Sequence, residues 1–376
     1  MLPKTSTTPS ILPDRYYTSF KANPTAFCCF ETEDPEDNTI KSFAIVGTLN
    51  GTIEIVALEK GAIPEVKFEH KSESQINAII LIATKPKIYF VAQFRGMELI
   101  WFNLDFENGM IKNLIKLKSY SLTHFGFCQS IWDKNEKRML VPGKDDDYEM
   151  LSILYENSGE KAISLGANFL FSSFKKRHPN TEFTVDDCFK GTISSFQQIH
   201  ETIGYEECDR LLIGFEDATL IIYDIRTKEV INLFKAPSKY SQLIAFAVSK
   251  DSEFQRWRIA VTVCSRIFEV NYENQEFELT KRIKKTGFAN VNCSHICFNT
   301  IGDILICGYS SGRIEFYNVP EYNIFKVMNF HESSILSMNV LTISKNDEIL
   351  FIGDEEGKMS QMNMKKLKCS QNVQEN

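Results

Sequence analysis

The chain has 376 residues, of which 43% are hydrophobic and 12% aromatic, enough β-favouring apolar side chain for a large core. Its formal net charge of -7 argues against a protein whose main task is to grip nucleic-acid phosphates, because that task needs a basic field. The first ten residues are polar and lack the apolar segment of a signal peptide. We therefore expect a protein of the nucleus and cytoplasm, with reduced cysteines.

One phrase recurs along the chain: an apolar β-favouring run, a Gly, a short polar turn and a second apolar run. It occurs around Gly47, Gly214, Gly308 and Gly353. The last two lie about 45 residues apart, which is the WD40 period. A single unit of this size cannot bury its own apolar face, so the repeat predicts units that stack on one another.

Alternating apolar residues and turn signals predict seven units in chain order. The first strand of the third unit is expected at residues 125–128, and the fifth unit is the most degenerate because its turn after Val263 lacks Gly. The predicted units span residues 24–58, 76–104, 124–155, 191–225, 241–272, 291–319 and 335–364.

A β-prone segment at residues 14–20 precedes the first unit and has no partner within it. We expect it to form the outer strand of the last unit, since joining both ends of the chain removes exposed sheet edges. The predicted fold is thus all-β: a seven-bladed WD40-type β-propeller, its ring closed by an N-terminal strand. The expected boundaries are a flexible N-terminus at 1–13, a propeller at 14–365 with an insertion at about 156–190, and a flexible tail at 366–376.

Three charged segments are candidate partner-binding loops, because variable loops on a rigid scaffold commonly carry binding. A solvated loop tip remains the alternative for the basic run of the insertion, since short basic runs match docking motifs easily. The candidates are Lys175, Lys176, Arg177 and His178 in the insertion, Lys144, Asp145, Asp146 and Asp147 in the third unit, and Asp34, Glu36 and Asp37 in the first.

The sequence gives only weak signals for a metal site or a catalytic site. Cys293, His295 and Cys297 alternate along a predicted strand, so their side chains should run parallel and not converge on a metal. The turn at 145–147 lacks the ligand spacing of a calcium loop, and the chain has no nucleophile elbow or phosphate-binding loop. We predict no enzyme, no metal and no cofactor.

Trp-Asp endings are nearly absent, and Asn50, Ser311 and Glu356 stand where a repeat of this type usually has its turn Asp. The blades should therefore depend more on apolar packing than on His-to-Asp hydrogen bonds. His331 is the residue expected to keep such a structural bond.

The order of these phrases resembles one WD-repeat family, the ASTRA-associated protein of yeasts, whose animal relative is called guanine-nucleotide-binding protein β-subunit-like protein. The most discriminating phrase is His124-Phe-Gly-Phe-Cys-Gln-Ser130, which is followed by Arg138-Met-Leu-Val-Pro-Gly143. The segments Pro13-Asp-Arg15, 211–225 and 330–335 also resemble that family, so the likeness spans residues 13–364.

The resemblance implies a non-catalytic scaffold that belongs to the ASTRA assembly. It would work with subunits of the Triple-T cochaperone complex in the maturation of phosphatidylinositol-3-kinase-like kinases and in chromatin regulation. The acidic net charge and the lack of an apolar span in the sequence further lead us to expect no direct contact with nucleic acid or membrane.

The alternatives are a Gβ-like signalling subunit or another propeller adaptor, and a propeller that handles small molecules. A Gβ subunit needs a long N-terminal coiled-coil helix, whereas only about a dozen polar residues precede the first expected strand. A ligand-binding propeller would need carboxylates or histidines gathered at the mouth of the ring, and the sequence offers no such cluster.

Overall fold

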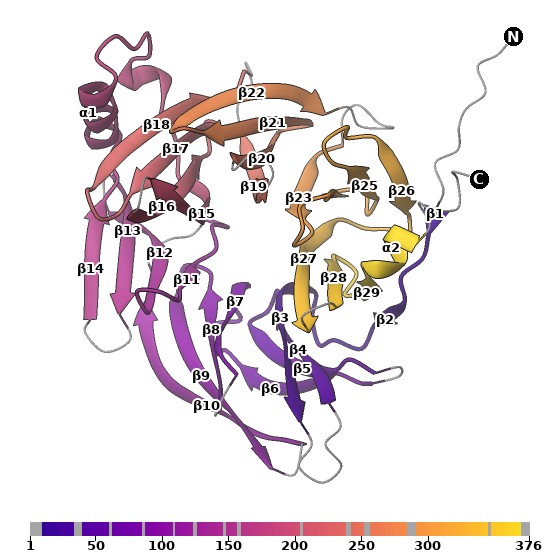
Figure 1. The fold of residues 1–376 in the computed structure, drawn as a ribbon. Helices are drawn as coiled ribbons and strands as arrows, with labels where there is room; N and C mark the ends of the chain where they lie inside the picture. Colours follow the sequence, from indigo (N-terminus) through magenta and orange to yellow (C-terminus); the bar gives the residue numbers. More distant parts are fainter. Residues whose placement is uncertain are drawn as a thin grey trace, which may run out of the picture.

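The computed structural model describes residues 10–369, apart from 34–39, 60–61, 85–86, 108–109, 123–125, 146–147, 156–158, 204–205, 238–241, 252–255, 284–290 and 345–346. Seven antiparallel sheets stand around a common axis, and the first strand of each lies innermost (Figure 1). This confirms the predicted seven-bladed β-propeller. Within the described residues, no helix is long and apolar enough to cross a membrane.

The first four blades follow the chain order from the inner to the outer strand. Blade one holds β3 (Pro24–Glu33), β4 (Ile40–Thr48), β5 (Thr52–Ala57) and β6 (Glu65–Glu69); blade two β7 (Ile76–Ala83), β8 (Ile88–Phe94), β9 (Glu98–Glu107) and β10 (Met110–Ser121); blade three β11 (Ile131–Asp133), β12 (Arg138–Asp145), β13 (Tyr148–Tyr155) and β14 (Gly159–Ser164); blade four β15 (Ile193–Ile203), β16 (Glu206–Phe215), β17 (Thr219–Asp224) and β18 (Glu229–Lys235).

The last three blades are equally complete, including the degenerate fifth, whose turn residue Cys264 takes a positive φ of 51° in place of a Gly. Blade five holds β19 (Leu243–Asp251), β20 (Arg256–Val263), β21 (Arg266–Glu273) and β22 (Glu276–Ile283); blade six β23 (Cys293–Phe298), β24 (Ile304–Tyr309), β25 (Ile314–Asn318) and β26 (Ile324–Met328); blade seven β27 (Ile335–Ser344), β28 (Asp347–Asp354) and β29 (Met359–Asn363).

The core is divided among the seven junctions between neighbouring blades, each with its own cluster of buried apolar side chains. Middle strands are therefore covered on both faces. In β17 every residue is buried, which explains why its sequence is a continuous apolar run and not an alternating one. Stacking of this kind is what the repeat predicted.

The ring closes as expected. β2 (Arg15–Tyr17) pairs antiparallel with β29 and becomes the outer strand of blade seven. A second N-terminal strand, β1 (Ser10–Ile11), was not expected: it pairs in parallel with β26 and adds a fifth strand to blade six. These two residues fall within the segment predicted to be flexible. At the other end, α2 (Lys365–Cys369) extends past the predicted limit of the propeller, with Leu367 buried.

Hydroxyl groups join adjacent blades where the inner strands begin. Thr25 Oγ1 donates to the carbonyl of Ile76 at 2.7 Å, and Ser294 Oγ donates to that of Ile335 at 3.1 Å. Each hydroxyl belongs to the extra residue of a β-bulge, which turns its side chain toward the next blade.

The expected first strand of the third unit is wrong. Residues 126–130 form a loop, and the inner strand is β11, which begins at Ile131. Side-chain amides of blade two hold this loop: Asn77 Nδ2 donates to Gly126 O and Gln93 Nε2 to Cys128 O, both at 2.9 Å. Backbone groups that a strand would have paired are bound by these amides instead.

The insertion is not a simple loop either. Residues 159–164 form β14, the outer strand of blade three, and the chain then enters α1 (Ala167–Arg177) and the short 3-10 helix η1 (Val185–Asp187). Figure 1 shows α1 on the outer rim of the ring, beside β18.

Candidate functional site

The predicted basic run ends α1. Lys175, Lys176 and Arg177 occupy its last turn, where positive side chains interact favourably with the negative end of the helix dipole. All three side chains are exposed, whereas His178 is half-buried and its ring stacks on Phe174 with 4.7 Å between centroids. His178 is thus the member of the run that packs against the rest of the chain, whereas the three basic side chains before it are exposed.

Those contacts fasten α1 to blade four. Leu170 and Phe174 are buried against the apolar cluster between blades three and four. Ser173 Oγ accepts the Val230 N–H at 2.9 Å, and His178 Nε2 lies 3.0 Å from the Ile231 carbonyl oxygen. Both backbone groups belong to the outer edge of β18, so α1 covers an edge that another chain could otherwise pair with.

Arg177 extends this contact to blade five, because its Nη2 donates to Gln275 Oε1 at 2.7 Å. Its Nη1 also lies 3.8 Å from Glu229 Oε2, and Lys176 Nζ lies 3.8 Å from Glu229 Oε1. These ion pairs are exposed and weak. Partner binding by the run remains a prediction, carried chiefly by Lys175 and Lys176.

The other two predicted loops are described in part or not at all. Lys144 and Asp145 are the last residues of β12, paired with β13. Asp146 and Asp147 lie outside the described residues, as do Asp34, Glu36 and Asp37. Their role in binding therefore stays a prediction.

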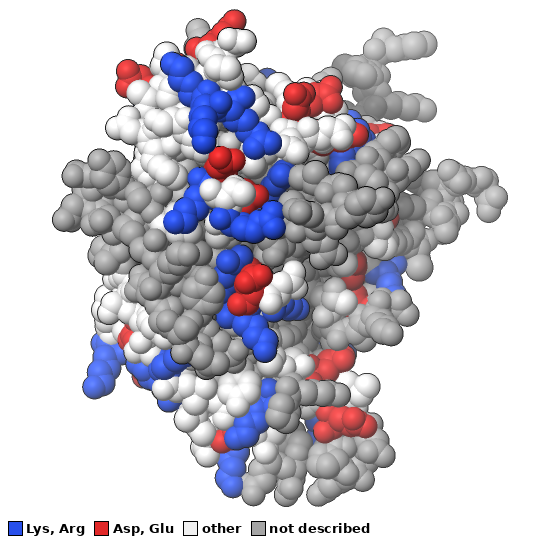
Figure 2. All heavy atoms as spheres, turned by 60° about the vertical axis from the view of Figure 1, so that its left-hand side comes forward, with Lys and Arg blue, Asp and Glu red and all other residues white. Residues whose placement is uncertain are grey.

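The outer face on the side of α1 and blade three carries mixed charge. Figure 2 turns this side forward and shows Lys and Arg side chains in several groups down the face, with Asp and Glu among them. Such interleaving gives local ion pairs and no single broad basic field. Among the described residues, this face therefore carries short basic stretches separated by acidic side chains.

A second surface is the end of the ring that carries the turn between the second and third strands of each blade. We call this end the turn face. Among the described residues, six of the seven blades, every one but blade three, have a backbone hydrogen bond that ties this turn to the loop that enters the same blade: for example, the Arg95 N–H donates to Gln75 O at 2.8 Å, and the Glu355 N–H to Ser334 O at 2.9 Å. The described turns of this face are thus held to the loops beside them.

The most prominent group on the turn face is an aromatic–cation pair that the sequence did not single out. Phe127 is 65% exposed, and the guanidinium carbon of Arg95 lies 3.9 Å from the centre of its ring. Phe127 belongs to the loop of residues 126–130, which the amides of Asn77 and Gln93 hold in place. The signal available in the sequence was an apolar Phe in a phrase that fits no repeat.

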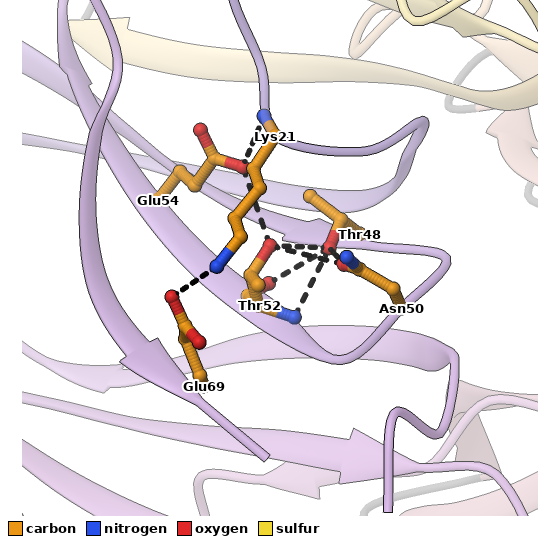
Figure 3. A network of polar contacts seen from close by, with 6 residues as sticks. All are labelled: Lys21, Thr48, Asn50, Thr52, Glu54 and Glu69. Carbon is orange, nitrogen blue, oxygen red and sulfur yellow. Dashed lines mark hydrogen bonds and ion pairs between the residues drawn. The ribbon is translucent and has the colours of Figure 1, made fainter. Parts of the chain in front are cut away.

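Buried polar networks brace the turns. In blade one, Figure 3 shows Glu54, Thr52 and Thr48 pointing toward one another, with Lys21 reaching over them from the chain that enters the blade. Glu54 Oε1 accepts the Lys21 backbone N–H at 2.8 Å and the Thr52 hydroxyl at 3.2 Å, while Lys21 Nζ pairs with Glu69. Burial raises the pKa of Glu54 despite these hydrogen bonds.

Blade six has a Glu at the equivalent place in its third strand. Glu315 is fully buried, and its Oε2 accepts the hydroxyls of Tyr309 at 2.8 Å and Tyr317 at 2.6 Å. Arg313 Nε donates to the other carboxylate oxygen at 2.9 Å. Four polar groups from one blade satisfy each other here, so the cluster is a structural brace.

Blade seven keeps the His-to-Asp bond. His331 Nδ1 lies 2.7 Å from Asp354 Oδ2, and its Nε2 lies 2.7 Å from Ser360 Oγ, with all three side chains buried. The acidic residue of this turn is therefore Asp354, two positions before the Glu356 to which the sequence pattern assigned it. This corrects the expectation that blade seven lacks a turn Asp.

No group of three or more His, Cys, Asp or Glu side chains in the described part of the chain is arranged to hold a metal ion. A β-bulge lies between Cys293 and His295, so the two do not share one face in simple alternation. Burial lowers the pKa of His295 to about 4 and raises the pKa of Cys297 to about 12. Both side chains are therefore neutral near pH 7.

The fold defines the class: a seven-bladed β-propeller. Solved structures agree with this. The β-propeller domain of Cps50 (Swd1) from Myceliophteria thermophila superposes with a TM-score of 0.61 at 14% identity, covering 93% of this chain and 99% of that one. Raptor from Chaetomium thermophilum gives 0.63 at 11% identity, covering 94% of this chain and 28% of that one. At these identities the likeness concerns the fold.

Sequence comparison adds no family. No protein-family model matches the chain, and no curated protein matches it.

Proposed function

We propose that the protein is a non-catalytic WD-repeat scaffold whose turn face binds protein partners around Phe127 and Arg95. The carrying observation is the ring of Phe127, 65% exposed and stacked under Arg95 in a loop fixed by hydrogen bonds from blade two. Aromatic and Arg side chains dominate the binding energy of protein interfaces, and a loop that is already ordered loses little entropy on binding.

We further propose that the partners are those the family resemblance implies: the ASTRA assembly, Triple-T cochaperone subunits and phosphatidylinositol-3-kinase-like kinases, with a role in kinase maturation and chromatin regulation. The support is residue-specific. The most discriminating phrase of that resemblance, residues 124–130, includes the loop that presents Phe127. A protein with these partners would be found in the nucleus and the cytoplasm.

The test is affinity purification from the native cell with quantitative mass spectrometry, comparing wild type, Phe127→Ala and Ile301→Ala. Ile301 is a matched control: it is also 65% exposed, but it lies in the turn between β23 and β24, at the other end of the ring. We expect wild type and Ile301→Ala to recover Triple-T subunits and the kinases, and Phe127→Ala to lose them.

Two results would contradict the proposal in different ways. Full recovery by Phe127→Ala would remove the turn face as the binding site. Recovery of a small γ-like subunit in place of the Triple-T subunits would make the protein a Gβ-like signalling subunit.

A further inference from the structure

The outermost strand of blade two differs from its counterparts. β10 has 12 residues, whereas the last strands of blades one, three, four and five have between 5 and 8. It lies at the end of its sheet, with β9 as its one partner among the described strands. Figure 1 shows it on the outer rim of the ring. One long edge of backbone donors and acceptors thus faces outward.

The outer edges of two other blades bind additional segments of the chain. On blade six, the extended segment Ser10–Ile11 adds to β26 as an extra strand. On blade four, Ser173 and His178 of α1 bind edge groups of β18. Among the described residues, no strand pairs with the outer edge of β10.

The side chains of β10 combine exposed apolar groups with positive charge. Ile115 is 41% and Leu117 is 50% exposed, and Lys112 and Lys116 are exposed beside them. Lys118 lies with its ammonium 4.9 Å from the centre of the Trp101 ring, so a third positive charge is fixed on the same strand. Apolar contacts and charge are therefore offered together along one edge.

Charge decides which occupant fits. A second copy paired edge to edge would bring the lysines of two β10 strands together, and like charges that face each other across a sheet are destabilising. β-Bulges at Lys112 and Leu117 also bend the edge and leave residues 113–116 as the regular stretch between them. A short acidic segment would meet opposite charge and needs only that stretch.

We propose that the β10 edge is a docking site for an extended acidic segment of a partner protein, which adds to blade two as a fifth strand. Main-chain hydrogen bonds to residues 113–116 would supply affinity, and contacts with Ile115, Leu117 and the lysines would supply selectivity. This site lies on the rim and does not depend on the turn face around Phe127.

The probe is a synthetic nine-residue peptide of alternating Glu and Val with blocked ends, and the matched control peptide has Lys in place of Glu. Binding is measured by fluorescence anisotropy at low and moderate salt, and the site by hydrogen exchange with mass spectrometry. We expect the acidic peptide to bind at least tenfold more tightly than the basic one, and its affinity to fall as the salt concentration rises. Its binding should slow hydrogen exchange in residues 110–121.

The variant Lys112→Glu/Lys116→Glu should lower the affinity for the acidic peptide at least tenfold. Leu279→Asp, at a 42% exposed position of the outer strand β22, is the matched control and should bind as wild type does. Because Lys116 Nζ lies 3.3 Å from Glu98 Oε2, the double variant could lose stability; Lys112→Glu alone leaves that ion pair intact and should still weaken binding.

Equal affinity for the two peptides, or slowed exchange in another blade, would overturn the proposal. Slowed exchange of residues 110–121 that grows with protein concentration in the absence of peptide would also overturn it, because a second copy would then be the occupant. Phe127→Ala should leave peptide binding unchanged, which keeps this test separate from that of the turn face.

Discussion

His331 and Asp354 form a buried pair inside blade seven, with 2.7 Å between Nδ1 and Oδ2 and neither side chain accessible to solvent. The imidazole comes from the loop that enters the blade and the carboxylate from the turn two strands later, so the bond fixes the loop on the turn. Ser360 holds the other ring nitrogen at 2.7 Å.

Removing the imidazole should destabilise the protein through the carboxylate it leaves behind. We expect His331→Ala to lower the free energy of unfolding by about 3 kcal/mol, the cost of a buried charge without its partner. Urea denaturation followed by circular dichroism measures this. A loss below about 1 kcal/mol would mean that water reaches Asp354 and that the pair is not a brace.

The same pair predicts a pH dependence. Burial alone would raise the pKa of Asp354, but hydrogen bonds from His331 and from the backbone of Lys358 and Glu356 lower it below its ordinary value of 3.8. A carboxylate with a lowered folded pKa stabilises the protein at higher pH, and that contribution is lost as the pH falls through the folded pKa. The stability difference between wild type and Asp354→Asn should therefore shrink as the pH falls from 7 toward 3.

Glu54 should behave in the opposite way, because burial raises its pKa. A raised folded pKa favours the protonated acid, so the stability it confers is present at low pH and is lost as the pH rises through that pKa. Glu54→Gln keeps an acceptor for the Lys21 N–H without the charge, and we expect it to be neutral or stabilising at pH 7.

Glu54→Ala is the contrasting variant. It leaves the Lys21 N–H and the Thr52 hydroxyl without their acceptor and should cost about 1–3 kcal/mol. Thermal unfolding of the two variants at pH 5 and pH 7 tests both statements; equal destabilisation by Gln and Ala would show that the charge itself is required.

Two turn glycines with the same backbone conformation provide a matched pair. Gly312 has φ +80° and Gly357 φ +81°, so both substitutions to Ala carry a similar strain of about 1–2 kcal/mol. A Cβ on Gly312 would lie 2.3 Å from the backbone oxygen of His331, whereas one on Gly357 would have its nearest neighbour at 3.5 Å. Gly312→Ala should therefore cost clearly more in chemical denaturation, and equal losses would contradict the packing seen at His331.

The first-blade register is tested by Phe27, which is buried and lies with its ring centre 5.7 Å from that of Phe351 in blade seven. Phe27→Ala should cost about 3–5 kcal/mol, since it opens a cavity at the junction that closes the ring. Tyr16→Ala, at an exposed aromatic, is the control and should lie much closer to wild type.

Charge reversal in the basic run should separate its two roles. Lys175→Glu/Lys176→Glu should leave the melting temperature nearly unchanged and lower the affinity for any partner that binds this run. His178→Ala and Arg177→Ala remove contacts with β18 and Gln275, so they should increase hydrogen exchange in α1 and β18. Unchanged exchange in both variants would show that apolar packing of Leu170 and Phe174 alone holds the helix.

Part of the fold could be predicted because its signals are local. Each blade repeats an apolar run, a turn glycine and a second run, and the spare strand at the N-terminus has no partner nearby, so the number of blades and the closure by β2 followed. The helix α1 was missed because it buries just two residues, Leu170 and Phe174, too few for a helical period to show.

The candidate binding site was harder to predict from the sequence than the fold. The sequence drew attention to charged loops, since charge runs are visible in one dimension. Phe127 has no such mark: its exposure depends on Asn77 and Gln93, which hold residues 126–130 as a loop from 35 to 49 positions away in the chain.

Local sequence patterns specify the blade architecture, because a strand that alternates or runs apolar, and a turn that needs glycine, depend on side chains within a few residues of each other. Which polar groups pair across the blades depends on the packing of the whole ring. Thr25 donates to the carbonyl of Ile76, and Arg95 lies over the ring of Phe127, each across a blade junction. For His331 the sequence pattern predicted the bond, but only the structure gave its partner, Asp354. Those pairings depend on how seven sheets pack into a closed ring, and no local pattern encodes that geometry.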